Sequence, residues 1–104
     1  MLESHLNTQD KYKILQRTKD IANEYGLTAK PAKNPKYKID VYNDNELIES
    51  IGATGYLDYP HYLLLEEQGK VAHGYADMRK KLYLHRHKAD HNLKGVLAKL
   101  LLWS

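Results

Sequence analysis

The sequence predicts a small α+β domain: an N-terminal helix, then a small antiparallel sheet of two or three strands, then two or three C-terminal helices. Two changes of hydrophobic period predict this class. Apolar residues recur at helical spacing before residue 26 and after residue 59, but alternate with polar residues over 37–51. A length of 104 residues fits one domain. We therefore expect residues 1–104 to form a single domain, with residues 1–10 as a flexible N-terminal arm.

The first helix is predicted over residues 10–25. Asp10 is a suitable N-cap, and Gly26 can adopt the left-handed conformation that commonly ends a helix. Between them, the apolar positions are spaced as on one helical face: Ile14, Ile21, Ala22 and Tyr25.

A β-hairpin is predicted over about residues 36–51. Its first strand has the period-2 pattern of a half-buried strand, with Tyr37, Ile39 and Val41 alternating with Lys38, Asp40 and Tyr42. Asn and Asp tolerate positive φ, so the Asn-Asp-Asn segment 43–45 predicts the turn and 46–51 the partner strand. Residues 27–30 are a candidate third strand, which we expect to stop at Pro31 because proline cannot donate a ladder hydrogen bond.

Two glycines, Gly52 and Gly55, follow the hairpin. Glycines at this spacing can belong to a phosphate-binding loop, but no Gly-Lys-Ser/Thr follows, and a tight turn between strand and helix is favoured. Asp58 is then a suitable N-cap for a helix that begins near Pro60 and ends near Gly69.

Two further helices are predicted over residues 75–88 and 93–103. In the first, Met78, Leu82 and His85 fall on one side, and Arg79, Tyr83 and Arg86 on an adjacent side. Asp90 or Asn92 caps the second helix. Its apolar stripe comprises Leu93, Val96, Leu97, Leu100 and Leu101.

Positive charge is concentrated in the last third of the chain. The net formal charge is +3, but residues 1–69 contain 8 Lys+Arg against 11 Asp+Glu, a balance of −3. Residues 70–104 contain 8 Lys+Arg against only Asp77 and Asp90, a balance of +6. Such an asymmetry bears on the partner of a protein rather than on its fold.

Several functional classes find no support in the sequence. The absence of cysteine excludes disulfides and thiolate metal sites and suits an intracellular or virion-interior setting. The first residues lack the pattern of a secretory signal, and no window approaches the about 20 apolar residues of a membrane span. Nucleophile motifs such as G-x-S-x-G are also absent. We therefore expect no enzymatic activity and no cofactor.

The six histidines are the obvious candidates for metal ligands. His87 and His91 are four residues apart and can share a helical face, but no further ligand completes a known spacing, and we expect Asp90 to point elsewhere. Glu66 and Glu67 are adjacent, which favours a solvated face. We therefore predict no metal site.

The predicted helix 75–88 is the segment most informative about function. Arg and Lys neutralise phosphates, whereas an aromatic ring can stack on a base. Arg79, Tyr83 and Arg86 are spaced to form one stripe. The candidate site for nucleic acid or another polyanion comprises Arg79, Lys80, Lys81, Tyr83, Arg86, His87 and Lys88. The alternative is a charged face that interacts only with water.

A second candidate surface is aromatic. The chain has nine Tyr and no Phe, and tyrosine suits interfaces because it joins apolar area to a hydroxyl group. The candidate interface residues are Tyr56, Tyr59, Tyr62 and Trp103. The alternative is that the tyrosines line the edge of the core.

Several motifs occur in a defined order: a lysine-rich hairpin, a GY-x-DY segment, an R-K-x-x-Y-x-x-R-H-K helix and a closing LLW. They fall on Gly52, Gly55, Tyr56, Asp58, Tyr59, Arg79, Lys80, Tyr83, Arg86, His87, Lys88, Leu101, Leu102 and Trp103. In this order they resemble a small uncharacterised domain family of nucleocytoplasmic large DNA viruses, although the stretch 63–78 is longer and less charged than the family pattern. The resemblance implies a viral protein, in the virion or the host cytoplasm or nucleus, and implies no activity.

Two functions are compatible with these features. The first is a non-enzymatic, small basic viral protein that binds nucleic acid or another polyanion through the helix 75–88. The alternative is a minor capsid, cement or other virion structural protein whose partner is an acidic protein surface, such as that of another virion protein. Neither function specifies an oligomeric state.

Overall fold

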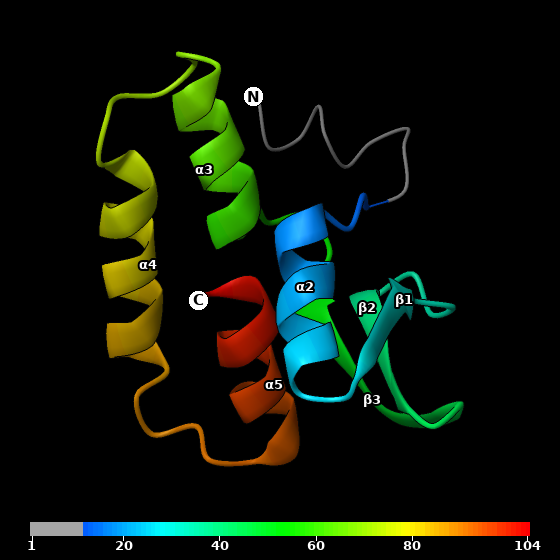
Figure 1. The fold of residues 1–104 in the computed structure, drawn as a ribbon. Coiled ribbons are helices and arrows are strands. Elements are labelled where there is room, and N and C mark those ends of the chain that lie inside the picture. The colour runs from blue at the N-terminus through cyan, green and yellow to red at the C-terminus, as the bar shows by residue number, and fades with distance from the viewer. Residues whose placement is uncertain (1–11) are drawn as a thin grey trace. The chain divides into compact units, whose positions relative to one another are not determined.

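The computed structural model describes residues 12–104, which form four helices and a three-stranded sheet (Figure 1). In chain order the elements are α2 (Gln16–Glu24), β1 (Thr28–Pro31), β2 (Tyr37–Asn43), β3 (Glu46–Ala53), α3 (Tyr59–Glu67), α4 (Tyr75–Arg86) and α5 (Leu93–Leu102). The predicted α+β class and its order of elements are confirmed. The arm predicted for residues 1–10, and Asp10 as a cap, lie outside the described residues.

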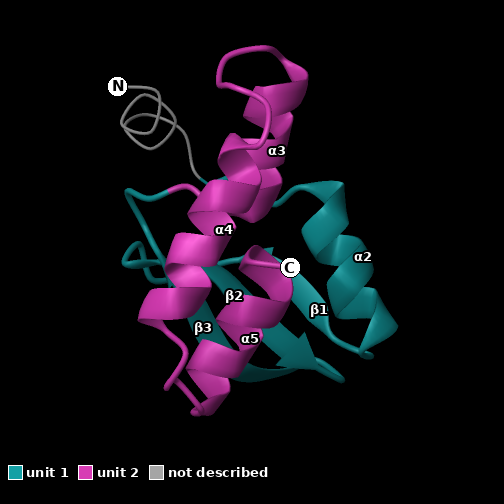
Figure 2. Ribbon diagram, turned by 90° about the vertical axis from the view of Figure 1, so that its left-hand side faces the viewer, with its two compact units in different colours: residues 1–56 teal, residues 57–104 magenta. Residues whose placement is uncertain are grey.

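The chain divides after Tyr56 into two compact units, residues 1–56 and 57–104 (Figure 2). The sheet and α2 belong to unit 1, whereas α3, α4 and α5 belong to unit 2. The single domain expected from the chain length stays a prediction.

In unit 1, α2 begins later than predicted. Leu15 precedes it in extended conformation, with ψ of 157° and no capping side chain, so the helix starts at Gln16 rather than near residue 10. Its end is as predicted. Gly26 has a φ of +71°, and the N–H of Leu27 donates to the carbonyl of Ala22 at 2.8 Å, which closes the last turn.

The sheet has the order β1-β2-β3, and both pairs of neighbouring strands are antiparallel. The predicted turn between β2 and β3 is confirmed, because Asp44 and Asn45 have φ values of 50° and 68°. Positive φ at both central residues is typical of the two-residue turns that match the twist of a hairpin. Strand β1 includes Pro31 as its last residue, and β3 continues to Ala53.

The prediction that β2 has one polar, solvated face is wrong. Ile39 and Val41 are fully buried as expected, but Lys38 and Asp40 on the other face are also buried. The carboxylate of Asp40 accepts hydrogen bonds from the Ser50 hydroxyl at 2.6 Å and from the backbone N–H of Lys33 at 3.2 Å. Buried polar groups need such partners, and a period-2 pattern gives no information about them.

In unit 2, each helix has its own N-terminal arrangement. The Asp58 carboxylate accepts from the backbone N–H of His61 at the start of α3, and Pro60 lies in the first turn, as predicted. Asn92 caps α5 by accepting from the backbone N–H of Gly95 at 2.7 Å. Helix α4 starts after Gly74 without a side-chain cap from that residue, and it ends at Arg86, two residues before the predicted end.

The core of unit 2 is partly aromatic. Its buried members are Leu57, Tyr59, Tyr62, Leu65 and Ala76, and Leu63, Val71, Tyr75 and Trp103 pack against them. The predicted apolar stripe of α5 is only partly correct. Leu97 and Leu101 are buried, but Leu93 and Val96 are about half exposed, because the buried face is turned toward Ala98 and Leu102.

No helix within residues 12–104 is long and apolar enough to cross a membrane.

Candidate polyanion interface on α4

Helix α4 carries its cations on two different faces. Ala76 is fully buried and marks the inner face, on which Arg79, Lys80 and Tyr83 are half-buried. Lys81 and Arg86 are exposed, as is Lys88, which follows the end of the helix. Within the stripe proposed from the sequence, Arg79 and Tyr83 are therefore half-buried, whereas Arg86, the last residue of α4, is exposed.

The two inner cations lie over the aromatic rings of α3. The guanidinium carbon of Arg79 is 5.6 Å from the centre of the Tyr62 ring, and the Lys80 ammonium is 4.8 Å from the centre of the Tyr59 ring. A cation over the face of a ring at these distances is attracted by the ring's quadrupole. The hydroxyl of Tyr59 also donates to the carboxylate of Asp77 at 2.7 Å. These contacts hold α4 against α3.

Tyr83 lies at the centre of an aromatic stack. Its ring is parallel to that of Trp103, with 4.3 Å between centroids and 6° between planes, and it also stacks with His87 at 4.3 Å. Two rings at this spacing occupy opposite faces of Tyr83, so neither face is open to a nucleic-acid base. Burial, and then the negative charge of Asp90, raise the pKa of the Tyr83 hydroxyl above its ordinary value of 10.0.

The prediction that Asp90 points away from the histidines is wrong. Its carboxylate lies 2.7 Å from Nδ1 of His87, in the loop between α4 and α5. The backbone carbonyl of Asp90 also accepts from the Lys99 ammonium at 2.9 Å. Asp90 therefore connects the end of α4 with α5. Within residues 12–104, no three His, Asp or Glu side chains are arranged to hold a metal ion.

The four candidate interface residues have different environments. Tyr62 is 2% exposed and Tyr59 is 9% exposed, and both are members of the unit 2 core. Trp103 is half-buried and packs against Tyr62 and Tyr83. Tyr56 alone among the four has a largely exposed side chain. The structure thus uses Tyr59 and Tyr62 as core residues, the alternative that the sequence left open.

Glu66 has a structural role that the sequence does not indicate. Its carboxylate accepts a 2.6 Å hydrogen bond from the backbone N–H of Ala76 in the first turn of α4, which has no cap of its own. The prediction that Glu66 lies on a solvated face beside Glu67 is wrong, since Glu66 is half-buried. The two partners are ten residues apart in two different helices, and no local motif indicates such a bond.

Three of the cations predicted to bind a polyanion are exposed in the structure. Lys81 and Arg86 are on α4, and Lys88 follows the end of the helix. The exposed side chains of Met78 and Leu82 lie between Lys81 and Arg86 around the helix. None of the three cations forms an ion pair within the described part of the chain. We refer to Lys81, Arg86 and Lys88 as the outer cations.

Comparison with known proteins assigns no family to this chain. No protein-family model matches it, and neither the curated proteins nor the solved structures contain a match. The viral origin implied by the motif resemblance stays a prediction.

Proposed function

We propose that this protein is a non-enzymatic binding protein whose outer cations contact nucleic acid or another polyanion. The observation that supports this function is the set of three exposed positive charges between residues 81 and 88 without a carboxylate partner among the described residues. Phosphates that bind such cations release condensed counterions, which favours association.

The rigidity of α4 supports the proposal further. Arg79 and Lys80 connect its inner face to α3, and Tyr83 stacks between Trp103 and His87. Lys81 and Arg86 therefore project from a helix that is held by its packing, and Lys88 follows its end. A ligand need not order the helix itself on binding. Since both faces of Tyr83 are covered, we expect recognition by charge rather than by base stacking.

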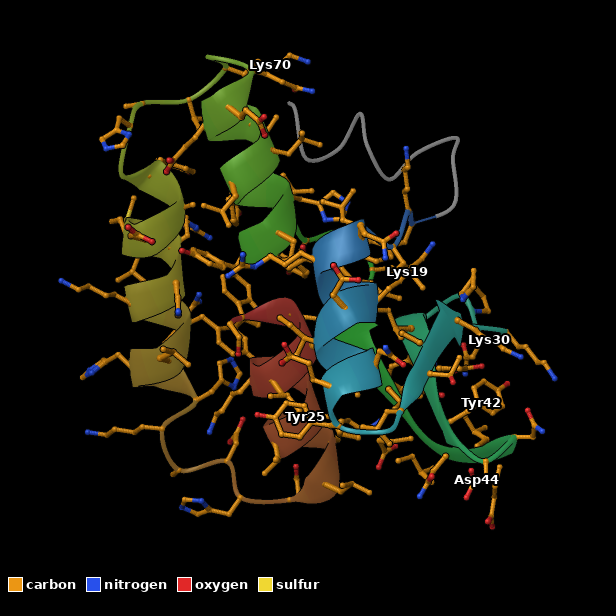
Figure 3. All side chains as sticks on the ribbon, in the orientation of Figure 1. Lys19, Tyr25, Lys30, Tyr42, Asp44 and Lys70 are labelled. Carbon is orange, nitrogen blue, oxygen red and sulfur yellow. The ribbon has the colours of Figure 1, made fainter. Side chains whose placement is uncertain are left out.

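A matched pair of variants tests this function. K81Q/R86Q/K88Q removes the outer cations, whereas K13Q/K19Q/K70Q removes the same charge at exposed lysines elsewhere; Figure 3 labels Lys19 and Lys70. Fluorescence anisotropy with labelled single- and double-stranded DNA and RNA should show at least about a tenfold rise in Kd for the first variant, with similar losses across base sequences. The control variant should lose much less. Equal affinity of the two variants would contradict the proposal.

One observation favours a second candidate function. Met78 is 43% exposed and Leu82 is 46% exposed, and they lie between Lys81 and Arg86 on the outer face of α4. An apolar strip bordered by cations suits an acidic protein surface, as expected for a minor capsid, cement or other virion structural protein. Tyr56 is a further exposed contact residue.

The two functions predict different results for nucleic-acid binding and for the amount of the protein in virions. M78S/L82S should leave nucleic-acid affinity within about twofold if phosphate contacts dominate. A structural role instead predicts no binding to nucleic acid and a stoichiometric amount of the protein in purified virions, measured by mass spectrometry. A stoichiometric amount of the protein in virions, without binding to nucleic acid, would replace the first proposed function by the second.

A further inference from the structure

We propose that the protein has a second nucleic-acid-binding surface, formed by Lys30 on β1 and by Lys33 and Lys36 in the turn between β1 and β2. We call these three residues the lysine turn. They belong to unit 1, whereas the outer cations belong to unit 2. A nucleic acid long enough to reach both surfaces would therefore bind the chain at two points. The two-point part of this inference rests on the proposed function of α4.

The charges of unit 1 are sorted along its strands. All three side chains of the lysine turn are exposed, and none forms an ion pair within residues 12–104. The exposed carboxylates lie elsewhere: on α2, at Asp20 and Glu24, and at the β2–β3 turn, at Asp44 and Glu46. Lys33 and Lys36 lie at the opposite end of β2 from that second turn, whereas Lys30 is opposite Asp40 in the middle of the strand. Two exposed lysines are therefore concentrated at the end of β2 away from the acidic turn, although the sequence of unit 1 has no net charge.

Asp40 pairs with Lys30 across the strands, and it is buried. It is 2% exposed and accepts from the Ser50 hydroxyl and from the backbone N–H of Lys33. The Asp40 carboxylate thus holds the backbone of the turn in place rather than forming a surface ion pair with the lysine side chains. The ammonium groups remain available for phosphates.

The backbone of the turn is fixed by several hydrogen bonds. The N–H of Lys36 donates to the side-chain oxygen of Asn34 at 3.0 Å, and the N–H of Tyr37 donates to the backbone carbonyl of Asn34 at 3.0 Å. The N–H of Ala32 donates to the carbonyl of Lys38 at 3.2 Å. Pro31 and Pro35 restrict φ on either side. A ligand therefore meets lysines on a pre-ordered backbone, which reduces the entropic cost of binding.

Lys30 is also positioned by its neighbour on β2. Its ammonium lies 5.1 Å from the centre of the Tyr42 ring, and the two side chains project from adjacent strands (Figure 3). This cation–π contact keeps the charge near the surface of the sheet. Since ring and ammonium are both accessible in part, Tyr42 and Lys30 can contact a sugar-phosphate backbone together.

Two surfaces in separate units lead to a dependence on ligand length. Once one surface holds a polyanion, the second binds it at a raised effective concentration, and avidity can exceed either affinity by about 10² to 10⁴. A ligand too short to reach both surfaces gains nothing from the second surface.

The test uses the full chain and single-stranded DNA of about 8 nucleotides, close to the site size of one small binding module, and of about 40 nucleotides, several times that size. Kd is measured by anisotropy for the wild type, K30Q/K33Q/K36Q, K81Q/R86Q/K88Q and the control K13Q/K19Q/K70Q. Thermal unfolding by circular dichroism confirms that each variant is folded. We expect K30Q/K33Q/K36Q to lose at least about tenfold in affinity for the long strand. Its affinity for the long strand should then be close to its affinity for the short strand.

The two proposals fail in different ways. If K30Q/K33Q/K36Q binds the long strand as the wild type does, while K81Q/R86Q/K88Q is weakened, the lysine turn is not a binding surface and the function of α4 stands. If only K30Q/K33Q/K36Q is weakened, the lysine turn binds but the proposed function of α4, and with it two-point binding, is wrong. If the loss is seen with polyglutamate and not with DNA, the partner is an acidic protein and the inference is overturned.

Discussion

The aromatic residues of unit 2 show how residue type alone can suggest two roles. Tyr83, next to several cations, has the chemistry expected of a base-stacking residue. In the structure its ring is covered by Trp103 and His87, and it serves to pack the end of α4. The sequence shows which residues are cations and which carry rings, but it does not reveal which rings pair with each other, because Trp103 is twenty residues from Tyr83.

Replacing Trp103 tests the importance of this stack. Trp103→Ala removes the parallel contact with Tyr83 and the packing against Tyr62, and we expect a loss of about 2–4 kcal/mol in the free energy of unfolding. Trp103→Phe should lose less, since it keeps a ring at the position. Urea denaturation followed by far-UV circular dichroism gives both values. A loss below about 0.5 kcal/mol for the alanine variant would show that the stack contributes little.

The raised pKa of Tyr83 predicts a pH effect on stability. In the unfolded chain the hydroxyl ionises near pH 10.0, whereas burial and Asp90 hold the proton longer in the folded protein. The contribution of this group to stability is therefore complete below about pH 10 and is lost as the pH rises through the folded pKa. The unfolding free energy of the wild type should fall more steeply above pH 10 than that of Tyr83→Phe. Parallel curves for the two proteins would mean that folding does not raise the pKa of the Tyr83 hydroxyl.

At the scale of elements, local signals predict helix and strand positions well but predict their faces poorly. The two-residue turn at Asp44 and Asn45, and the caps at Asp58 and Asn92, depend on side chains within a few residues, and the structure contains all of them. Burial of Asp40 depends on Ser50 in the next strand, and the orientation of α4 depends on its contacts with α3. These contacts join distant segments, and periodicity does not reveal them.

The bond from Ala76 to Glu66 predicts an unequal effect of two adjacent carboxylates. Glu66→Ala leaves an N–H in the first turn of α4 without its acceptor and removes a negative charge from the positive end of the helix. We expect a loss of about 0.5–2 kcal/mol in the free energy of unfolding. Glu67→Ala, at an exposed position, should stay within about 0.5 kcal/mol of the wild type. Equal losses, measured by urea denaturation, would exclude a capping role for Glu66.

At the scale of the whole molecule, charge is distributed differently in sequence and in structure. The sequence places an excess of +6 in residues 70–104. The structure assigns two of those cations, Arg79 and Lys80, to contacts with aromatic rings, and leaves the outer cations as the exposed part of the candidate site. It also draws attention to the lysine turn, which lies outside the basic segment. Net charge by segment therefore indicates the class of partner but not the residues that contact it.

The dependence of binding on salt tests the central claim most directly. Each phosphate contact contributes about −0.9 to the slope of log K against log salt concentration on duplex DNA. The three outer cations alone predict a slope of about −2 to −3, and the lysine turn would bring it to about −5. K81Q/R86Q/K88Q should flatten the wild-type slope by about 2 to 3. A Kd that stays constant between about 50 and about 500 mM salt, or an unchanged slope in this variant, would contradict polyanion binding by α4.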